Sequence, residues 1–239
     1  MVVEEMVKIK REKLSYEWLA GFFDAEGCVY IGKFPYWGAS LSVSMSQNDS
    51  FLLKEILSFI GFGNGPRSYR NQNWSEISFG DRDSEKLLER MLPYLKVKVL
   101  QARLALQFME LKVYDGRPLS GKEVRWRKMH YELMRLYKRP VWLGGSSEIS
   151  FRWLAGFFDG EGSCCKSKRW NVLLVQIGQK DPRILERIRS FLGYGKVYYD
   201  KNWDGFSFRC VNKEALKFLR DVLPFLKVKF AKAVSFLES

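Results

Sequence analysis

The sequence has very little histidine and cysteine, and this scarcity excludes several kinds of site. The single histidine, His130, stands in a strongly basic stretch, so a histidine base or a histidine-ligated metal would depend on one residue. The four cysteines include no C-x-x-C pair, which argues against a zinc ribbon or a disulfide framework. They are typical of reduced thiols, so we expect an intracellular protein, in an organelle or in a prokaryotic cytoplasm.

Long apolar runs are also missing. None approaches the ~20 residues that span a bilayer, and residues 1–13 lack the apolar stretch of a signal peptide. We therefore expect a soluble globular protein with no membrane partner.

Positive charge, in contrast, is abundant. Lys and Arg number 40 against 27 Asp and Glu, a net charge of +13 that suits a polyanion such as nucleic acid or an anionic membrane surface. The charge is spread along the whole chain and is not gathered in an amphipathic helix or a tail, which favours nucleic acid. A merely basic surface is the remaining alternative.

The chain contains an internal repeat. A segment over residues 15–27 returns at 150–162 with most positions identical, and two later landmarks recur in the same order, at 59–63 with 191–195 and at 92–98 with 223–229. Such duplication predicts two pseudosymmetric halves. We place them at residues 1–112 and 148–239, with a linker over 113–147 that holds a basic helix over 122–137.

Each half has the same predicted order of elements, αββαββα, which gives a duplicated α+β fold. In the first half the motif helix is followed by strands over 28–34 and 39–47, a helix over 50–60, strands within 67–72 and over 75–79, and helices over 84–92 and after Lys98. The second of these strands alternates serine with apolar residues, and Ser207 and Arg209 alternate with apolar residues in the other half. The pattern predicts that each sheet has one buried face and one polar face turned to DNA.

The repeated segment predicts a pair of closely packed helices. Ser15 and Ser150 stand where N-caps belong. Gly21 and Gly156 lie inside helices that glycine weakens by about 1 kcal/mol, and close contact between the two helices would explain them. Helices side by side would bring Glu26 and Glu161 close together at the DNA-facing surface, where magnesium could bridge such carboxylates to phosphate.

The two segments Leu19-Ala-Gly-Phe-Phe-Asp-Ala-Glu-Gly27 and Leu154-Ala-Gly-Phe-Phe-Asp-Gly-Glu-Gly162 resemble the paired signature motifs of a monomeric LAGLIDADG homing endonuclease. The resemblance covers nearly the whole chain. It implies two antiparallel sheets that form a DNA-binding saddle, and site-specific, Mg²⁺-dependent (or Mn²⁺-dependent) hydrolysis of double-stranded DNA at a long asymmetric target. It also implies a monomer with no obligate protein partner.

The resemblance assigns roles to residues at matching positions. Glu26 and Glu161 match the metal-binding acids, where this chain has Glu in place of the motif's final Asp, and the carbonyl groups of Ala25 and Gly160 are further metal ligands. Asp24 and Asp159 match a mainly structural aspartate. The remaining catalytic candidates are two glutamines, which could orient water, and two lysines, which could stabilise developing charge: Gln47, Gln179, Lys98 and Lys229.

The DNA-contact candidates follow from strand alternation. In the first half they are Tyr30, Ser40, Ser42, Ser44, Arg70, Trp74 and Glu76, and in the second half Arg169, Gln176, Lys196, Tyr198, Ser207 and Arg209. A register error of one residue would turn a strand's face away. Arg70 and Arg209 are the preferred base readers, because guanidinium can donate two hydrogen bonds to guanine.

Two other functions remain open at this stage. The first is a DNA-binding regulator or an intron maturase of the same fold that does not cleave, although both acids are present here. The second is a structural or ligand-binding protein in which Glu26 and Glu161 form helix-end salt bridges, which would leave the charge and the polar strand faces unexplained.

Overall fold

The structure is a computed structural model that describes residues 11–33, 39–68, 73–110, 119–137, 148–167 and 171–238. Its contacts divide the chain into two compact units. The C-terminal unit consists of Met1–Ala25 with Ser146–Ser239, and the N-terminal unit consists of Glu26–Gly145. The first motif helix, α2 (Tyr16–Glu26), thus belongs to the C-terminal unit except for its last residue.

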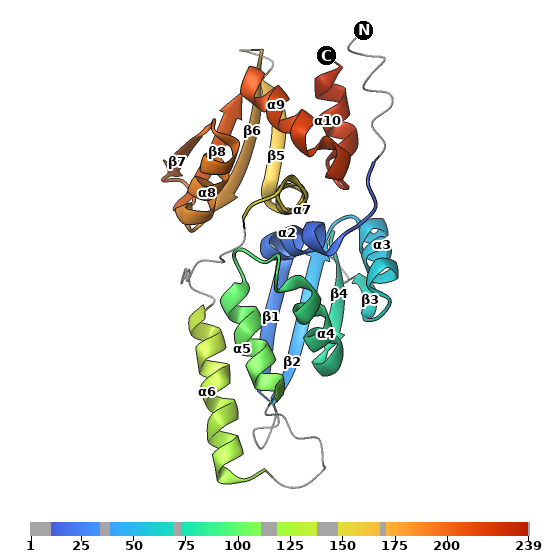
Figure 1. The fold of residues 1–239 in the computed structure, drawn as a ribbon, viewed down its shortest axis with the longest axis vertical. Coiled ribbons are helices and arrows are strands. Elements are labelled where there is room, and N and C mark those ends of the chain that lie inside the picture. Colours follow the sequence, from blue (N-terminus) through green and yellow to red (C-terminus); the bar gives the residue numbers. More distant parts are fainter. Residues whose placement is uncertain are drawn as a thin grey trace. The chain divides into compact units, whose positions relative to one another are not determined.

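The N-terminal unit contains a four-stranded antiparallel sheet in the order β1-β2-β4-β3 (Figure 1). Along the chain its elements are β1 (Gly27–Lys33), β2 (Ala39–Gln47), α3 (Ser50–Ile60), β3 (Asn64–Ser68), β4 (Ser75–Gly80), α4 (Asp81–Met91), α5 (Val99–Glu110) and α6 (Gly121–Tyr137). The predicted limits of β2 and α3 are confirmed. The third strand begins at Asn64, three residues before its predicted start at Arg67.

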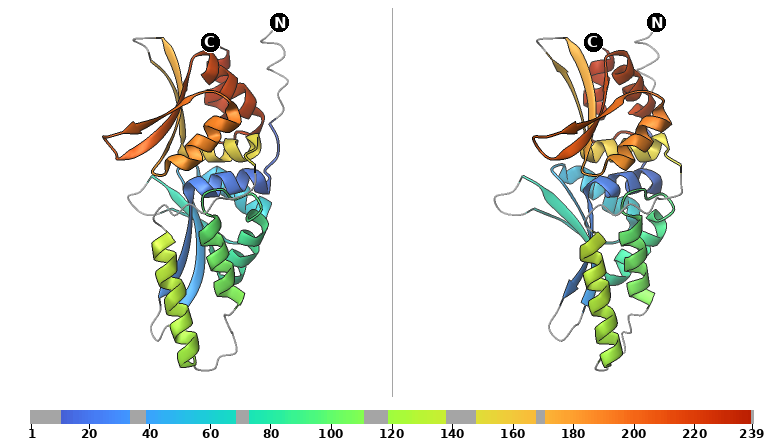
Figure 2. Two further views of the ribbon diagram at one scale, coloured as in Figure 1. Left: turned by 60° about the vertical axis from the view of Figure 1, so that its left-hand side comes forward. Right: turned by 90° about the vertical axis from the view of Figure 1, so that its left-hand side faces the viewer.

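Strand β2 shows why one face of this sheet is buried. Leu41, Val43 and Met45 are at most 1% exposed. Helices α3, α4 and α5 contact β2 and cover one face of the sheet (Figure 2). The intervening serines are half-exposed on the other face. The predicted division between an apolar face and a hydroxyl-bearing face is therefore confirmed for β2.

Helix α6, the predicted basic helix, packs on α5 and β1. The Trp126 ring stacks on Phe108 with centroids 5.7 Å apart, and it lies 3.8 Å from the His130 ring. Ser120 and Glu123 begin the helix as a capping box, because the Glu123 carboxylate accepts the Ser120 N–H (2.8 Å) and the Ser120 hydroxyl accepts the Glu123 N–H (3.3 Å). Although α6 is rich in basic residues, it packs on α5 and β1 through aromatic side chains such as Trp126.

The C-terminal unit repeats the same arrangement, with a sheet in the order β5-β6-β8-β7 and helices packed on one of its faces (Figure 2). Besides α2, its elements are α7 (Phe151–Glu161), β5 (Gly162–Ser167), β6 (Val172–Gln179), α8 (Pro182–Leu192), β7 (Lys196–Asp200), β8 (Gly205–Val211), α9 (Lys213–Val222), η2 (Leu223–Phe225) and α10 (Phe230–Leu237). Two four-stranded sheets in repeated αββαββα order confirm the predicted fold class.

Helices α2 and α7 pack against each other at their glycines. A Cβ atom on Gly21 would lie 2.0 Å from the Trp153 carbonyl oxygen, and one on Gly156 would lie 2.0 Å from the Trp18 carbonyl oxygen. Only glycine fits at either position, because the clash is with rigid backbone. The predicted close packing of the two motif helices is confirmed.

None of the helices in the described ranges is both long enough and apolar enough to cross a membrane.

Candidate active site and nucleic-acid interface

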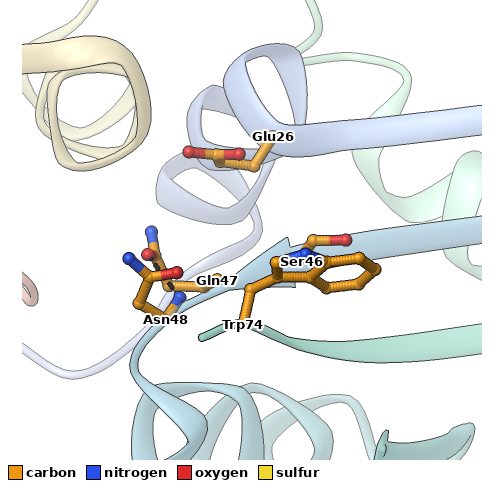
Figure 3. Close-up of a pocket in the computed structure, with 5 residues that line it drawn as sticks. All are labelled: Glu26, Ser46, Gln47, Asn48 and Trp74. Carbon is orange, nitrogen blue, oxygen red and sulfur yellow. Dashed lines mark hydrogen bonds between the residues drawn. The ribbon is translucent and has the colours of Figure 1, made fainter. Parts of the chain in front are cut away.

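Glu26 lies at the edge of a depression of about 340 Å³ in the N-terminal unit, lined also by Ser46, Gln47, Asn48 and Trp74 (Figure 3). The sequence places it there because α2 ends at Glu26 and β1 starts at once, with Gly27 opposite Met45 of β2. Ser46 and Gln47 end that neighbouring strand. Figure 3 shows the Glu26 carboxylate and the Gln47 and Asn48 side chains on the same side of the depression.

The equivalent region of the C-terminal unit has Glu161, which is exposed at the end of α7. Here Gly162 begins β5 opposite Ile177 of β6, and Gln179 ends β6 two residues later. The two repeats therefore bring an acid and a glutamine to the same end of their respective sheets. The proximity of Glu26 to Glu161 remains a prediction, because the two acids belong to different compact units.

Lys229 is positioned by the aspartate of the second motif. Its N–H donates to one oxygen of the Asp159 carboxylate (2.9 Å), and its ammonium group donates to the Asp159 carbonyl oxygen in the last turn of α7. The side chain is thereby fixed two residues from Glu161. Lys98 has the corresponding place before α5, where it is half-buried and its carbonyl oxygen accepts the Ala102 N–H.

Both motif aspartates are buried and hydrogen-bonded. Asp159 accepts backbone N–H groups from Lys227 (2.7 Å) and Lys229, and burial raises its pKa, although these hydrogen bonds act in the opposite direction. Asp24 is 1% exposed and accepts the indole N–H of Trp153 at 3.0 Å. These contacts fit the mainly structural role predicted for the aspartates.

The open face of the β1–β4 sheet brings together most of the predicted DNA-contact residues of the first half. Because directly opposed residues of antiparallel strands share a face, the register places Tyr30 beside Ser42, and Ser46 beside Glu76. Tyr30 is 45% exposed. Ser40 and Ser44 lie on the same face, and Trp74 lies at its Glu26 end.

The open face of the β5–β8 sheet carries the predicted contacts of the second half. One row across the strands contains Gln176, Arg209 and Lys196, and the next contains Ser207 and Tyr198. Ser207 is only 5% exposed, and a Cβ atom on Gly178, its cross-strand partner on β6, would lie 3.5 Å from the Trp203 ring. The burial of Ser207 restricts a base contact by its hydroxyl group, a constraint that strand alternation did not reveal.

Two comparisons of sequence place these features in a known group of proteins. The sequence profile of the LAGLIDADG endonuclease family matches residues 154–238. Over 109 residues the chain is 35% identical to the DNA endonuclease I-CvuI of Chlorella vulgaris. In both comparisons the matched residues are similar in sequence to LAGLIDADG endonucleases. The aligned region covers 41% of this chain and 66%, or just under two thirds, of I-CvuI.

Solved structures of LAGLIDADG proteins share the fold. The complex of the homing endonuclease I-GzeII with its DNA target matches with a TM-score of 0.71 and 17% identity over 95% of this chain and 89% of that one. I-SmaMI bound to cleaved DNA matches with a TM-score of 0.64 and 21% identity, over 96% of this chain and 89% of that one. I-SmaMI bound to uncleaved DNA with calcium ions gives 0.63 and 21%, with coverage of 95% and 90%.

The oxygen donors near the LAGLIDADG acids suit a hard cation. No group of three or more His, Cys, Asp or Glu side chains able to hold a metal occurs among the described residues, so a closed all-protein site is absent there. Each LAGLIDADG helix instead ends with one carboxylate, from Glu26 or Glu161, preceded by the carbonyl group of Ala25 or Gly160. Magnesium is commonly held by one or two carboxylates together with water and substrate phosphate, so this donor set fits it.

Two predicted DNA-contact residues lie outside the described residues, and two other polar residues of these surfaces were not among the predicted ones. Arg70 and Arg169 lie outside the described residues. Arg67, opposite Glu76 on the open face, was not predicted as a contact, although it is a cation on an exposed strand. Asn48 was also missed, although its position directly after Gln47 at the end of β2 could have indicated it.

Proposed function

We propose that this chain is a site-specific endonuclease that makes a double-strand cut in DNA at a long asymmetric target, as a monomer and with a divalent metal ion. The observation that carries the proposal is the repeated placement of an acid, Glu26 or Glu161, at the end of a motif helix and at the edge of a sheet with an open polar face. I-CvuI is itself a DNA endonuclease, and I-SmaMI binds cleaved DNA. We further propose that the enzyme acts inside the cell.

Different side chains have different roles in phosphodiester hydrolysis, and the first role is metal binding. Glu26 with the Ala25 carbonyl group, and Glu161 with the Gly160 carbonyl group, would hold Mg²⁺ or Mn²⁺. Such an ion supplies charge to the phosphate and lowers the pKa of a bound water.

The other polar side chains act on the attacking water and on the developing charge. Gln47 and Gln179 lie at the ends of β2 and β6, where an amide can orient water. Lys229, held by Asp159, and Lys98 offset charge that develops on the cleaved phosphate.

The target is long because each sheet covers roughly one turn of duplex, about 10 bp, giving about 20 bp in all. It is asymmetric because the two open faces differ. Ser40, Ser42 and Ser44 of β2 correspond to Val172, Leu174 and Gln176 of β6. A single chain carries both motifs and both sheets, so it needs no partner subunit. Light scattering of the DNA complex checks this, and an obligate two-chain complex on a palindrome would refute it.

Cleavage selection from a randomised duplex library with Mg²⁺ tests the activity and supplies the target. Glu26→Gln and Glu161→Gln should each abolish double-strand cleavage while binding persists, because the amide keeps the shape of the side chain and removes the charge that holds the metal. Glu238→Gln, at the exposed end of α10, is the matched control and should cleave normally. Sequence-specific binding without cutting by the unaltered chain would favour a regulator or a maturase, and full activity of both Gln variants would refute the assignment of the acids.

A further inference from the structure

The open face of the β5–β8 sheet carries an apolar row directly beside its arginine. Leu174 of β6 lies opposite both Val211 of β8 and Cys165 of β5, so three apolar side chains cross the sheet together. Val211 is 45% exposed, and Cys165 is exposed as well. An exposed row of apolar side chains is informative on a surface that is expected to bind a polyanion. Such a row would gain contact only where the partner offers an apolar group.

Arg209 lies in the neighbouring row and is oriented by its surroundings. Its guanidinium donates to the Asp200 carboxylate at 3.4 Å and lies 5.5 Å from the centre of the Tyr198 ring. Its Nε is buried and has no hydrogen-bond partner among the described residues. A depression of about 490 Å³ is lined by Arg209, Leu174, Val211, Tyr198 and Lys196, so the arginine and the apolar pair share one concave surface.

The major groove offers a matching pair of chemical groups. Guanine presents N7 and O6 to a guanidinium, and thymine presents the only apolar group of the groove, its 5-methyl. On the basis of the proposed function, we infer that the sheet formed by β5–β8 reads a guanine with Arg209 and a thymine methyl group with Leu174 and Val211. The recognised feature is thus a G and a T in the half-site bound by the C-terminal unit.

Strand geometry sets the order and spacing of these bases. The Arg209 row lies nearer to the Glu161 end of the sheet than the Leu174–Val211 row, and the two rows are two residues apart along β6 and β8. Two strand residues rise by about 6.8 Å, which equals about two base pairs at 3.4 Å each. Where the strands follow the groove, the thymine therefore lies about two base pairs farther from the cleaved phosphates than the guanine.

The other sheet supplies a matched comparison. The positions equivalent to Leu174 and Val211 are occupied by Ser42 and Gly80, which offer a hydroxyl group and no aliphatic side chain. The third residue of that row is Tyr30, which lies beside Ser42 as Cys165 lies beside Leu174. Because the aliphatic pair is absent, the half-site bound by β1–β4 should be insensitive to thymine methyl groups at the place that faces Ser42 and Gly80. The two sheets differ in which chemical groups of the groove they recognise, in addition to the bases they prefer.

Replacing thymine by deoxyuridine tests this inference, since it removes only the methyl group. The probes are duplexes recovered from the randomised library, with one thymine at a time replaced, and the measurement is the binding affinity without cleavage. In the C-terminal half-site one replacement should weaken binding about four-fold, as expected for one buried methyl group. At the equivalent place in the N-terminal half-site affinity should stay unchanged.

A second replacement tests the contact between Arg209 and guanine. Replacing the guanine by 7-deazaguanine removes N7 and should weaken DNA binding by the unaltered chain. The same replacement should cause no further loss of affinity in the Arg209→Ala variant.

Variants of the apolar pair link the methyl effect to the named side chains. Leu174→Ser and Val211→Ser lie on an exposed face and should keep the melting temperature, yet they should bind thymine and deoxyuridine duplexes equally. Met129→Ser, which replaces an exposed apolar residue of α6, is the control and should keep the full four-fold preference. If every deoxyuridine duplex binds as well as its thymine parent, the inference is overturned while the proposed function stands. Failure of the unaltered chain to select any sequence refutes the proposed function instead.

Discussion

The repeated helices and the repeated sheets of this molecule have diverged to different extents. Helices α2 and α7 keep nearly the same sequence, and each places a glycine against the backbone of the other. The open sheet faces differ, with Ser42 opposite Gly80 in one and Leu174 opposite Val211 in the other. Residues that contact each other across the repeat must change together, whereas outward-facing residues can change one at a time.

The helix pair itself is not fully symmetric. The indole N–H of Trp153 donates to Asp24, whereas the buried indole N–H of Trp18 has no hydrogen-bond partner in the described part of the chain. Asp159 instead accepts the backbone N–H groups of Lys227 and Lys229. The two tryptophan indoles of the motif helices therefore differ in their hydrogen bonding, and this difference can be measured.

The largest effect should come from breaking the shared helix contact. Gly21→Ala and Gly156→Ala should each lower the free energy of unfolding by roughly 3 kcal/mol, at the upper end of overpacking effects, because the added methyl group meets backbone. Chemical denaturation measures the loss. Gly121→Ala is the control, since its nearest contact is the flexible Arg125 side chain at 3.7 Å, and it should be neutral or slightly stabilising. Equal stability of all three variants would contradict the close packing of α2 and α7.

The next largest effect should come from the equivalent lysines of the two units, which precede α5 and α10 and should contribute similarly to the cleavage rate. Lys98→Met and Lys229→Met should each slow cleavage roughly 100-fold with little change in binding, as for the loss of a group that stabilises developing charge. Lys227→Met is the matched control, because the Lys227 ammonium group donates to the Glu12 carbonyl oxygen and lies on the same loop. Single-turnover rates on the selected target decide the result. Normal rates in both variants would leave the lysines with a structural role only.

A smaller effect should distinguish Trp18 from Trp153, measured as the loss in the free energy of unfolding when each is replaced by Phe. Trp153→Phe and Trp18→Phe remove the same volume from buried sites, but only the first removes a hydrogen bond, the one that the Trp153 indole donates to the buried Asp24 carboxylate. Trp153→Phe should therefore cost about 1–2 kcal/mol more than Trp18→Phe. Denaturation of both variants under one buffer condition measures the difference. Equal losses would mean that the hydrogen bond adds nothing to the stability of the helix pair.

The sequence predicted local structure well wherever the pattern was strongly periodic. Strand β2 and helix α3 begin and end as predicted, because the alternation of serine with Leu41, Val43 and Met45 has only one periodic interpretation. Strand β3 was placed too late. It begins at Asn64 beside Gly63 and Gly65, both with positive φ, and such glycine-rich segments give no periodic signal.

The site was predicted less completely than the fold. Sequence position was enough to locate the acids at the ends of the motif helices and the glutamines at the ends of β2 and β6, while their catalytic roles stay predictions. The burial of Ser207 depends on side chains from other parts of the fold, and alternation along one strand contains no information about them. The asymmetry between Trp18 and Trp153 is likewise a matter of side-chain contacts between helices with almost the same sequence.

The last difference between the units is that the one histidine of the chain, His130, belongs to the N-terminal unit. His130 is 4% exposed, and burial lowers its pKa from the ordinary 6.5, while the hydrogen bond from Nδ1 to the Trp126 carbonyl oxygen (3.1 Å) acts to raise it. A lowered pKa in the folded state means that the unfolded chain binds the proton more readily. The stabilising contribution is therefore present above pH 6.5 and is lost as the pH falls through the lowered pKa.

His130→Gln should remove this pH dependence, because no other histidine titrates in that range. The unaltered protein should lose stability relative to the variant as the pH falls below 6.5, and this should be the smallest of the effects. Hydrogen exchange locates it: amides of α6, which packs on α5 and β1, should lose protection first, while those of β5–β8 should stay protected. A pH profile that is the same for both proteins would show that the imidazole keeps its ordinary pKa in the folded chain, so that its packing between Trp126 and Phe108 does not restrict protonation.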